Sequence, residues 1–166
     1  MVRVEPLQAS HMPDVLRIQA QCYTEIVPES ATSLHAKLAA SPRTCFVAEG
    51  GDAVLGYLIS APIRFPQLPP LDAPAFDLSP DADALYLHDL AIAEDGRGTG
   101  AGQLLVRCVL DAARAQGLHA ACLVAIQGSA AYWQRFGFTR VAPPDGAVAA
   151  KLASYGTGAQ LMTAQL

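Results

Sequence analysis

The chain has 166 residues, of which 52% are hydrophobic and 16% are charged, and its 11 Lys and Arg against 15 Asp and Glu give a net charge of −4. This length suits a single domain over residues 1–166, and the hydrophobic content excludes global disorder. The acidic balance argues against a nucleic-acid-binding surface, which needs a clustered basic excess. Because no apolar stretch is long enough to cross a bilayer and no apolar signal core follows Met1, we expect a cytoplasmic protein without a membrane partner.

The first half of the chain has the pattern of a strand, two helices and a hairpin. Ser10 is the expected N-cap of the first helix, and Gly50-Gly51-Asp52 forms the turn of the hairpin. Residues 61–80 contain six prolines, so we expect a long loop there that acts as a lid or a binding wall. The expected elements are a strand over 2–7, helices over 11–22 and 32–40, and strands over 44–50 and 53–60.

The second half of the chain centres on a glycine loop. The run GRGTGAG, residues 96–102, lies between a strand and a strongly amphipathic helix that Gly117 ends. The expected elements are a strand over 84–93, helices over 103–116 and 129–137, and strands over 118–126, 138–142 and 158–166.

A glycine loop between a strand and a helix favours an anion. Glycine lets a ligand approach the backbone, and the first N–H groups of the helix point outward at the positive end of its dipole, which suits a phosphate or pyrophosphate. A P-loop is excluded because Gln103 and Leu104 follow the last glycine. A dinucleotide fingerprint on Gly96, Gly98 and Ala101 lacks the acidic residue that should end the next strand. A plain loop in which glycine relieves strain is the remaining alternative.

The longer run LAIAEDGRGTGAGQLLVRCVLDAARAQG resembles the acetyl-CoA-binding segment of the GCN5-related N-acetyltransferase (GNAT) superfamily. Its signature of Arg or Gln, two residues, Gly, one residue, then Gly or Ala falls on Arg97, Gly100 and Gly102. AAYWQRFGF resembles the aromatic helix and Gly-Phe of the same superfamily. The resemblance implies an α/β (α+β) fold with a mixed, mostly antiparallel sheet of six to seven strands, splayed at its centre and flanked by about four helices.

The resemblance also implies acetyl-CoA (coenzyme A) as the cofactor. Its pantetheine arm would lie between the strands that end near Ala93 and Ile126, and its pyrophosphate would lie on the loop amides. The expected cofactor-binding residues are Leu90, Ala91, Ile92, Arg97, Gly98, Thr99, Gly100, Ala101, Gly102, Gln103, Ser129 and Trp133.

Acetyl transfer to an amine requires a base, because an ammonium with a pKa of about 10.4 costs roughly 4 to 5 kcal/mol to deprotonate at pH 7. His88 is the candidate. YLHDLAI resembles the arylalkylamine (serotonin) N-acetyltransferase branch, in which two histidines take the proton, and Tyr86 stands at the first of those positions. Strand alternation places Tyr86, His88, Leu90 and Ile92 on one face and Asp89 on the other, which gives Asp89 a local structural role. The alternative for His88 is a structural hydrogen bond.

The departing thiolate accepts a proton from a Tyr that precedes Gln-Arg-Phe-Gly-Phe in the same branch. Trp133 stands there in this chain, and an indole N–H is not a useful acid. We expect Trp133 to pack against the thioester or the pantetheine. The adjacent Tyr132 is the candidate acid, with core packing as its alternative.

The loop between the first two helices walls the acceptor site in the superfamily. The predicted substrate-binding residues are Tyr23, Glu25, Glu29 and Tyr86. The proline-rich loop adds Phe65, Asp72, Phe76, Asp77, Asp81 and Asp83. Carboxylates and aromatic rings suit a cationic amine, so the sequence predicts an acetyl-CoA-dependent N-acetyltransferase of a small (aryl)alkylamine, ahead of a peptide N-terminus or a lysine. A non-catalytic acyl-CoA-binding module and a nucleotide-linked reductase are the alternative functions, and the chain is expected to be a monomer or a homodimer.

The cysteines and histidines are too dispersed for a metal site. Cys22, Cys45, Cys108 and Cys122 match neither a metal knuckle nor a secreted disulfide scaffold. We therefore expect buried free thiols and no metal.

Overall fold

The computed structural model describes residues 1–24 and 27–166. Its helices are α1 (Met12–Cys22), α2 (Ala31–Ala40), α3 (Ala101–Ala115), α4 (Ala130–Gln134) and α5 (Gly146–Ser154). Its strands are β1 (Val2–Pro6), β2 (Phe46–Gly50), β3 (Ala53–Ile63), β4 (Ala84–Ile92), β5 (Ala120–Ala125), β6 (Thr139–Arg140) and β7 (Gln160–Gln165). No helix in these described residues is long and apolar enough to cross a membrane.

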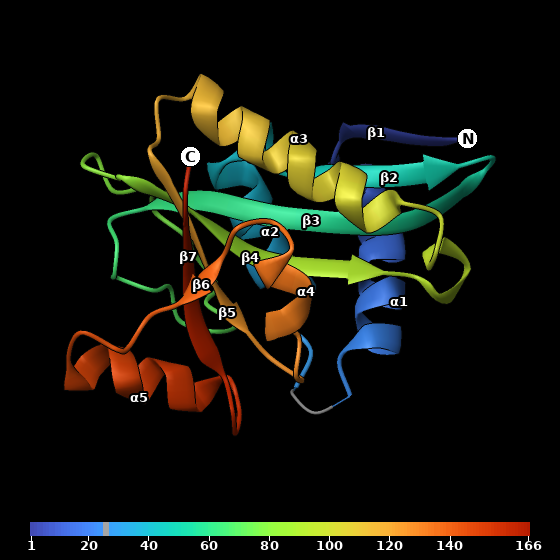
Figure 1. The fold of residues 1–166 in the computed structure, drawn as a ribbon. Coiled ribbons are helices and arrows are strands. Elements are labelled where there is room, and N and C mark those ends of the chain that lie inside the picture. The colour runs from blue at the N-terminus through green and yellow to red at the C-terminus, as the bar shows by residue number, and fades with distance from the viewer. Residues whose placement is uncertain (25–26) are drawn as a thin grey trace.

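The strands form one mixed sheet in the order β1-β2-β3-β4-β5-β7-β6. Neighbouring strands are antiparallel except β4 and β5, which run parallel. Figure 1 shows α3 lying across one face of this sheet, with α1 and α2 behind it. The core is divided accordingly, because α3 packs with β2 to β5 in one apolar cluster and α1 packs with the opposite face of β2 to β4 in another. The prediction of a mostly antiparallel mixed sheet is confirmed.

The sheet opens between β4 and β5. Only three residue pairs join these strands, Ala84 with Ala120, Leu85 with Ala121 and Tyr86 with Cys122. Beyond these pairs, β4 runs on to Ile92 and β5 to Ala125 without pairing with each other. The two strands therefore diverge, and the side of β4 that faces β5 has no strand partner along its second half. The splay that the family resemblance implies is therefore present.

A β-bulge in β4 changes the predicted faces. Asp89 pairs with Ile59 and Leu87 with Ser60, so His88 is an extra residue in the ladder. Leu87 packs in the α3 cluster, whereas Ala91 packs in the α1 cluster, so the parity of the strand reverses across the bulge. The prediction that Tyr86, His88, Leu90 and Ile92 share one face is wrong: Leu90 and Ile92 pack toward α3, and Tyr86 belongs to a third cluster with α5.

Local chemistry explains where the helices begin. Ser30 caps α2, since its hydroxyl accepts from the amide of Ser33 at 3.2 Å, and α3 starts directly after Gly100. Ser10 is not the N-cap of α1, because a 3-10 turn over Ala9–His11 precedes that helix. The fifth helix, α5, exceeds the expected number of about four and is capped by Asp145, whose carboxylate accepts from the amide of Val148 at 2.9 Å.

Residues 64–80 of the proline-rich segment contain no helix or strand, as predicted, but residues 61–63, which were expected to be loop, continue β3. The loop is nonetheless tied down on both sides. The carboxylate of Asp72 accepts from the amide of Ser30 at 2.7 Å, which joins the loop to the start of α2. On the other side, Lys151 donates to the carbonyl of Leu68, and the hydroxyl of Tyr155 donates to the carbonyl of Pro69 at 3.2 Å. The loop is therefore a fixed strap between α2 and α5.

Candidate active site

A cavity of about 330 Å³ lies in the opening between β4 and β5. Its walls come from the end of α1, both diverging strands, α4 and the proline-rich loop. The predicted site residues that the structure brings together on these walls are Tyr23, Glu29, His88, Leu90, Ala91, Ile92, Arg97, Ser129, Tyr132 and Trp133. Tyr86 is not among the lining residues, and Glu25 lies outside the described residues.

The predicted cofactor loop has the backbone that its glycines suggested. Gly98 and Gly100 have φ of 76° and 87°, a left-handed conformation that side chains disfavour. The hydroxyl of Thr99 donates to the carbonyl of Gly96 at 2.5 Å and accepts from the amide of Ala101 at 3.3 Å, which holds the loop in place. The remaining members of the predicted set, Gly102 and Gln103, lie in the first turn of α3, whose N–H groups have no acceptor within the helix.

Two side chains at the end of α1 contact main-chain carbonyls on the edge of β4 that has no strand partner. The hydroxyl of Tyr23 donates to the carbonyl of Leu90 at 2.7 Å, and the thiol of Cys22 donates to the carbonyl of Ile92 at 3.2 Å. Tyr23 therefore reaches the cavity wall, as predicted, but its hydroxyl is engaged with the strand. Across the opening, the side-chain amide of Gln127 donates to the carbonyl of Cys22 at 3.1 Å, so the end of β5 is linked to the end of α1.

His88 is held by the carboxylate of Glu29, a residue of the loop between α1 and α2. Its Nε2 lies 2.7 Å from Oε1 of Glu29, and both side chains are nearly inaccessible, with 4% and 7% exposed. Nδ1 of His88 is also buried and has no hydrogen-bond partner among the described residues. A buried polar atom without a partner at a cavity wall needs an explanation, and a substrate or a water molecule in the cavity would provide one.

Glu29 is the centre of a buried polar cluster. Its Oε2 lies 3.2 Å from Nζ of Lys37 and accepts weakly from the hydroxyl of Ser33 at 3.4 Å, while Oε1 accepts from the amide of Asp72 at 3.2 Å. Burial alone would raise the pKa of Glu29, but the hydrogen bond from His88 and the charges of His88 and Lys37 outweigh it and lower that pKa to about 2. The carboxylate is therefore ionised at neutral pH, and protein donors already occupy both of its oxygens.

Asp89 lies beside this cluster in the core. Its Oδ2 accepts from the hydroxyl of Tyr57 at 2.7 Å, which agrees with the local structural role that the sequence suggested. Burial raises the pKa of Asp89, against the charge of His88 and the hydrogen bond from Tyr57. The expectation that the strand separates Asp89 completely from His88 does not hold, because the bulge lets both residues line the same cavity.

Both aromatic rings of α4 line the cavity, and Trp133 also packs in the core. Trp133 is buried at 8% exposure, with its ring centroid 5.7 Å from that of Phe138. Tyr132 is half-buried, and its hydroxyl comes within 2.7 Å of the point where a Cβ on Gly102 would lie. Burial raises the pKa of Tyr132, with Arg135 opposing, so the phenol stays protonated at neutral pH.

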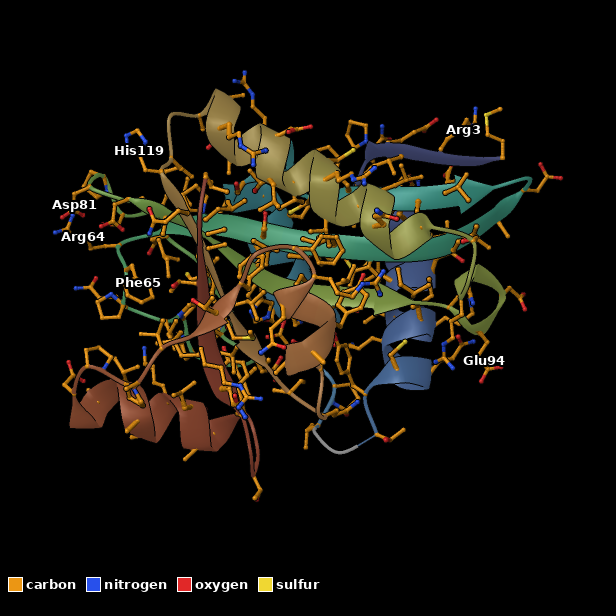
Figure 2. All side chains as sticks on the ribbon, viewed as in Figure 1. Arg3, Arg64, Phe65, Asp81, Glu94 and His119 are labelled. Atoms are coloured by element: carbon orange, nitrogen blue, oxygen red, sulfur yellow. The ribbon has the colours of Figure 1, made fainter. Side chains whose placement is uncertain are left out.

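Several acceptor residues predicted from the sequence lie elsewhere. Tyr86 is buried, and its hydroxyl lies 2.9 Å from that of Tyr155, which does line the cavity. Phe65 and Asp81 lie with Arg64 at the end of the molecule opposite Glu94 (Figure 2). The other members that do not line the cavity are Asp72, Phe76, Asp77 and Asp83. The proline-rich loop contributes Leu71 to the cavity wall instead.

Lys37 is the functional-site residue that sequence reasoning missed. Its side chain is 2% exposed, and Nζ also donates to the hydroxyl of Ser33 at 2.9 Å. A signal was available, because Lys37 lies on the apolar stripe that Leu34 and Leu38 form, where a lysine requires a buried partner.

Comparison with known proteins agrees with this geometry. The model of the acetyltransferase (GNAT) family matches residues 12–138, so the chain belongs to that family. Membership in the arylalkylamine branch is not shown, and a comparison with the curated proteins gives no match.

Solved structures share the fold at low sequence identity. The loading GNATL domain of CurA from Lyngbya majuscula is 14% identical with a TM-score of 0.79, and the alignment covers 99% of this chain and 98% of that one. The ribosomal-protein-S18-alanine N-acetyltransferase from Escherichia coli is 15% identical with a TM-score of 0.70, covering 99% and 94%. N-acetylglutamate synthase from Neisseria gonorrhoeae, solved with coenzyme A and N-acetyl-glutamate, is 13% identical with a TM-score of 0.76, covering 100% and 35%. Such similarity establishes the fold and leaves the reaction to be argued from the site.

Proposed function

We propose that the protein transfers the acetyl group of acetyl-CoA to the primary amine of a small molecule. The observation that carries this proposal is the position of His88 on the wall of the cavity between β4 and β5, a wall that also includes Arg97 of the glycine loop; Nδ1 of His88 is buried and has no partner among the described residues. Family membership supports the reaction class. The residues of this chain supply the remaining arguments.

The glycine loop and β4 fit coenzyme A. A Cβ on Gly98 or Gly100 would meet nothing within 4 Å, so the side of the loop toward the solvent is open to a ligand that approaches the backbone. Amides in the first turn of α3 and the guanidinium of Arg97 would hold the pyrophosphate. The unpaired part of β4 offers main-chain groups to the pantetheine, as in strand addition. When bound, acetyl-CoA supplies a thioester whose acyl carbon is open to attack by an amine.

His88 is the proposed base. An ionised carboxylate can only accept a hydrogen bond, so Glu29 requires a proton on Nε2 of His88; once the ring carries a single proton, its lone pair is therefore on Nδ1. That lone pair can receive the proton that an ammonium must lose, directly or through one water molecule. Deprotonation would otherwise cost roughly 4 to 5 kcal/mol at pH 7.

Tyr132 is the proposed acid for the departing sulfur. Its hydroxyl lies near the start of α3, beside the path that runs from the glycine loop into the cavity, and its raised pKa keeps the proton available. Trp133 stands where the family usually has Tyr; it packs against Phe138 in the core and also lines the cavity, where it can contact the thioester or the pantetheine. A thiolate with a conjugate-acid pKa of about 8.5 leaves without full protonation, so removal of the Tyr132 hydroxyl should slow the reaction less than removal of His88.

The acceptor side suits a small molecule better than a peptide. The proline-rich strap is bonded to Glu29 and Ser30 on one side and to α5 on the other, which closes the groove that an extended chain would need. The cavity, at about 330 Å³, is at the small end of ligand sites. Its lining is aliphatic near Leu71, Leu87 and Leu123 and aromatic at Tyr23, Tyr132, Trp133 and Tyr155, so it suits either an alkyl or an aryl group on the amine.

The experiment measures binding first and turnover second. Calorimetry with coenzyme A, with NADH as the comparison, tests the cofactor, and thiol release from acetyl-CoA with a panel of small amines and N-terminal peptides tests the reaction. His88→Ala should retain coenzyme A binding and lose thiol release. The matched control is His119→Ala, because His119 lies on the surface (Figure 2) and should leave both unchanged.

Each outcome separates the candidate functions. Tight coenzyme A binding without thiol release from any acceptor would favour the non-catalytic binding module, which the replacement of the usual Tyr by Trp133 also suggests. Faster release with peptides than with small amines would contradict the assignment of a small acceptor. Absence of coenzyme A binding would refute the proposal as a whole.

A further inference from the structure

We infer that Glu29, neutralised by Lys37, is a positioning residue that holds His88 in the tautomer with its proton on Nε2, so that Nδ1 is the atom that takes the amine proton. This inference rests on the proposed function for its catalytic meaning. The tautomer itself is a property of the resting protein and can be observed without any turnover.

The contacts of His88 leave one arrangement of the ring protons. Oε1 of Glu29 is 2.7 Å from Nε2, and the ring is packed at 5.6 Å between centroids against Tyr86, which restricts its rotation. A proton on Nδ1 with a bare Nε2 would place a ring lone pair against a carboxylate oxygen and leave the Nδ1 proton buried without an acceptor. The structure therefore favours a proton on Nε2 whenever Glu29 is ionised.

Lys37 explains how a carboxylate can remain ionised at this depth. Its Nζ is 3.2 Å from Oε2 and 3.3 Å from Oε1 of Glu29, and it is held by Ser33 as well. The charged groups that face His88 are therefore Glu29 with Lys37 behind it on the α2 side, and Asp89 on its own strand. The Glu29–Lys37 pair is neutral overall, which lets the carboxylate orient the ring without a net negative charge in the acceptor site.

Glu29 cannot serve as the acceptor-binding carboxylate that the sequence suggested while this cluster is intact. Its oxygens accept from Lys37, Ser33, His88 and the amide of Asp72, and its own backbone is tied to Gln19, whose side chain exchanges hydrogen bonds of 3.0 and 3.1 Å with the amide and carbonyl of Glu29. The bond from Asp72 also fixes the proline-rich strap to the oxygen that holds His88. The orientation of the His88 ring and the position of the proline-rich strap therefore both depend on Oε1 of Glu29.

The proton balance of the step is simple. The substrate ammonium first passes one proton to Nδ1 of His88, which releases it to solvent. As the neutral amine nitrogen then bonds to the acyl carbon and the carbon–sulfur bond breaks, a second proton passes from the nitrogen to Nδ1, and the sulfur takes up a proton from Tyr132 or from solvent. His88 is then protonated on both nitrogens, with Nε2 still bonded to Glu29, and the carboxylate stabilises this cation. Proton transfer from Nδ1 to solvent, or back to Tyr132, restores the resting state.

The first test reads the tautomer by NMR of protein labelled with ¹⁵N at histidine. His11 is an internal reference, because its Nδ1 accepts from the amide of Gln8 at 3.0 Å and its Nε2 lies 3.5 Å from Glu49. In the wild-type protein, at a pH where the His88 ring carries a single proton, that proton should be on Nε2 and not on Nδ1. In Glu29→Gln, the amide can donate as well as accept, so the Nε2-protonated form should fall to a mixture. A proton on Nδ1 of His88 in the wild type would overturn the inference, whether or not the protein is an acetyltransferase.

The second test reads catalysis. Removal of a general base costs about 10²- to 10⁴-fold, so loss of its orientation in Glu29→Gln should lower kcat by about 10- to 100-fold while leaving coenzyme A affinity unchanged. Glu49→Gln is the matched control, since it removes a carboxylate beside a histidine far from the cavity, and it should change neither kcat nor the His88 signals. If Glu29→Gln does not fold, Glu29→Gln/Lys37→Met removes both charges together and is read in the same way.

The outcomes distinguish this inference from the proposed function. Wild-type protein that shows the expected tautomer but releases no thiol would refute the proposed acetyltransferase activity and the catalytic meaning of the tautomer, while supporting the role of Glu29 in orienting the His88 ring. An active wild type in which Glu29→Gln keeps both kcat and the tautomer would refute the positioning role alone.

Discussion

Substitution of Lys37 by methionine should destabilise the protein by about 3 kcal/mol. The ammonium is 2% exposed and Glu29 is 7% exposed, so Lys37→Met leaves a carboxylate in the interior without its charged partner. Removal of one member of a buried ion pair costs roughly 3 to 5 kcal/mol. The fall of the pKa of Glu29 from 4.5 to about 2 corresponds to about 3 kcal/mol of net stabilisation of the ionised form, because the interactions with His88 and Lys37 exceed the cost of burial by that amount.

Urea unfolding followed by circular dichroism at pH 7 measures this cost. A domain of this size has about 5 to 15 kcal/mol of stability, so the variant should remain folded. The double variant Glu29→Gln/Lys37→Met removes both charges and should recover at least half of the loss, which gives a coupling energy that the single variants cannot. Lys151→Met is the control, because that lysine is exposed on α5 and its single bond to Leu68 is worth about 1 kcal/mol. A loss of less than 1 kcal/mol in Lys37→Met, equal to that of the control, would refute the buried pair as a stabilising unit.

Three further outcomes follow from the same structure. Because folding lowers the pKa of Glu29, its contribution to the free energy of unfolding is complete above about pH 4.5 and is lost as the pH falls toward 2. The urea midpoint of the wild type should therefore fall over this pH range, and that of Glu29→Gln should fall less. Gly102→Ala places a Cβ 2.7 Å from the hydroxyl of Tyr132, so it should slow thiol release at saturating substrate, with no additional effect in a Tyr132→Phe background. Gly100→Ala should cost about 1 to 2 kcal/mol through its φ of 87° alone, whereas Gly146→Ala, equally open but without positive φ, should not destabilise in thermal unfolding.

The cofactor loop was predictable because its signal is local. Gly98 and Gly100 adopt positive φ next to the start of α3, and both the backbone requirement and the anion-binding chemistry are contained in seven consecutive residues. The order of the strands and the open sheet followed from the same family resemblance. Helix α5 was missed although Asp145 is an effective N-cap, because the alanine-rich turn that follows has little amphipathic contrast.

The polar centre of the site could not be predicted in the same way. A one-residue bulge at His88 reverses the faces of β4, and strand periodicity contains no sign of where such a bulge falls. Glu29 is 59 positions from His88, so their contact depends on how the loop before α2 packs on the sheet. Taken alone, Glu29 looked like a carboxylate for an amine, and only its contact with Lys37 shows that its charge is already compensated.

The opening between β4 and β5 is closed at both of its ends. Three residue pairs ending at Tyr86 and Cys122 join the strands at one end, and the link from Gln127 to Cys22 joins β5 to α1 at the other. The six residues from Cys122 to Gln127 span about 16 Å between these two links. Because the links lie at the two ends of the opening, substitutions that repack the side chain of Cys122 should change the width of the cavity.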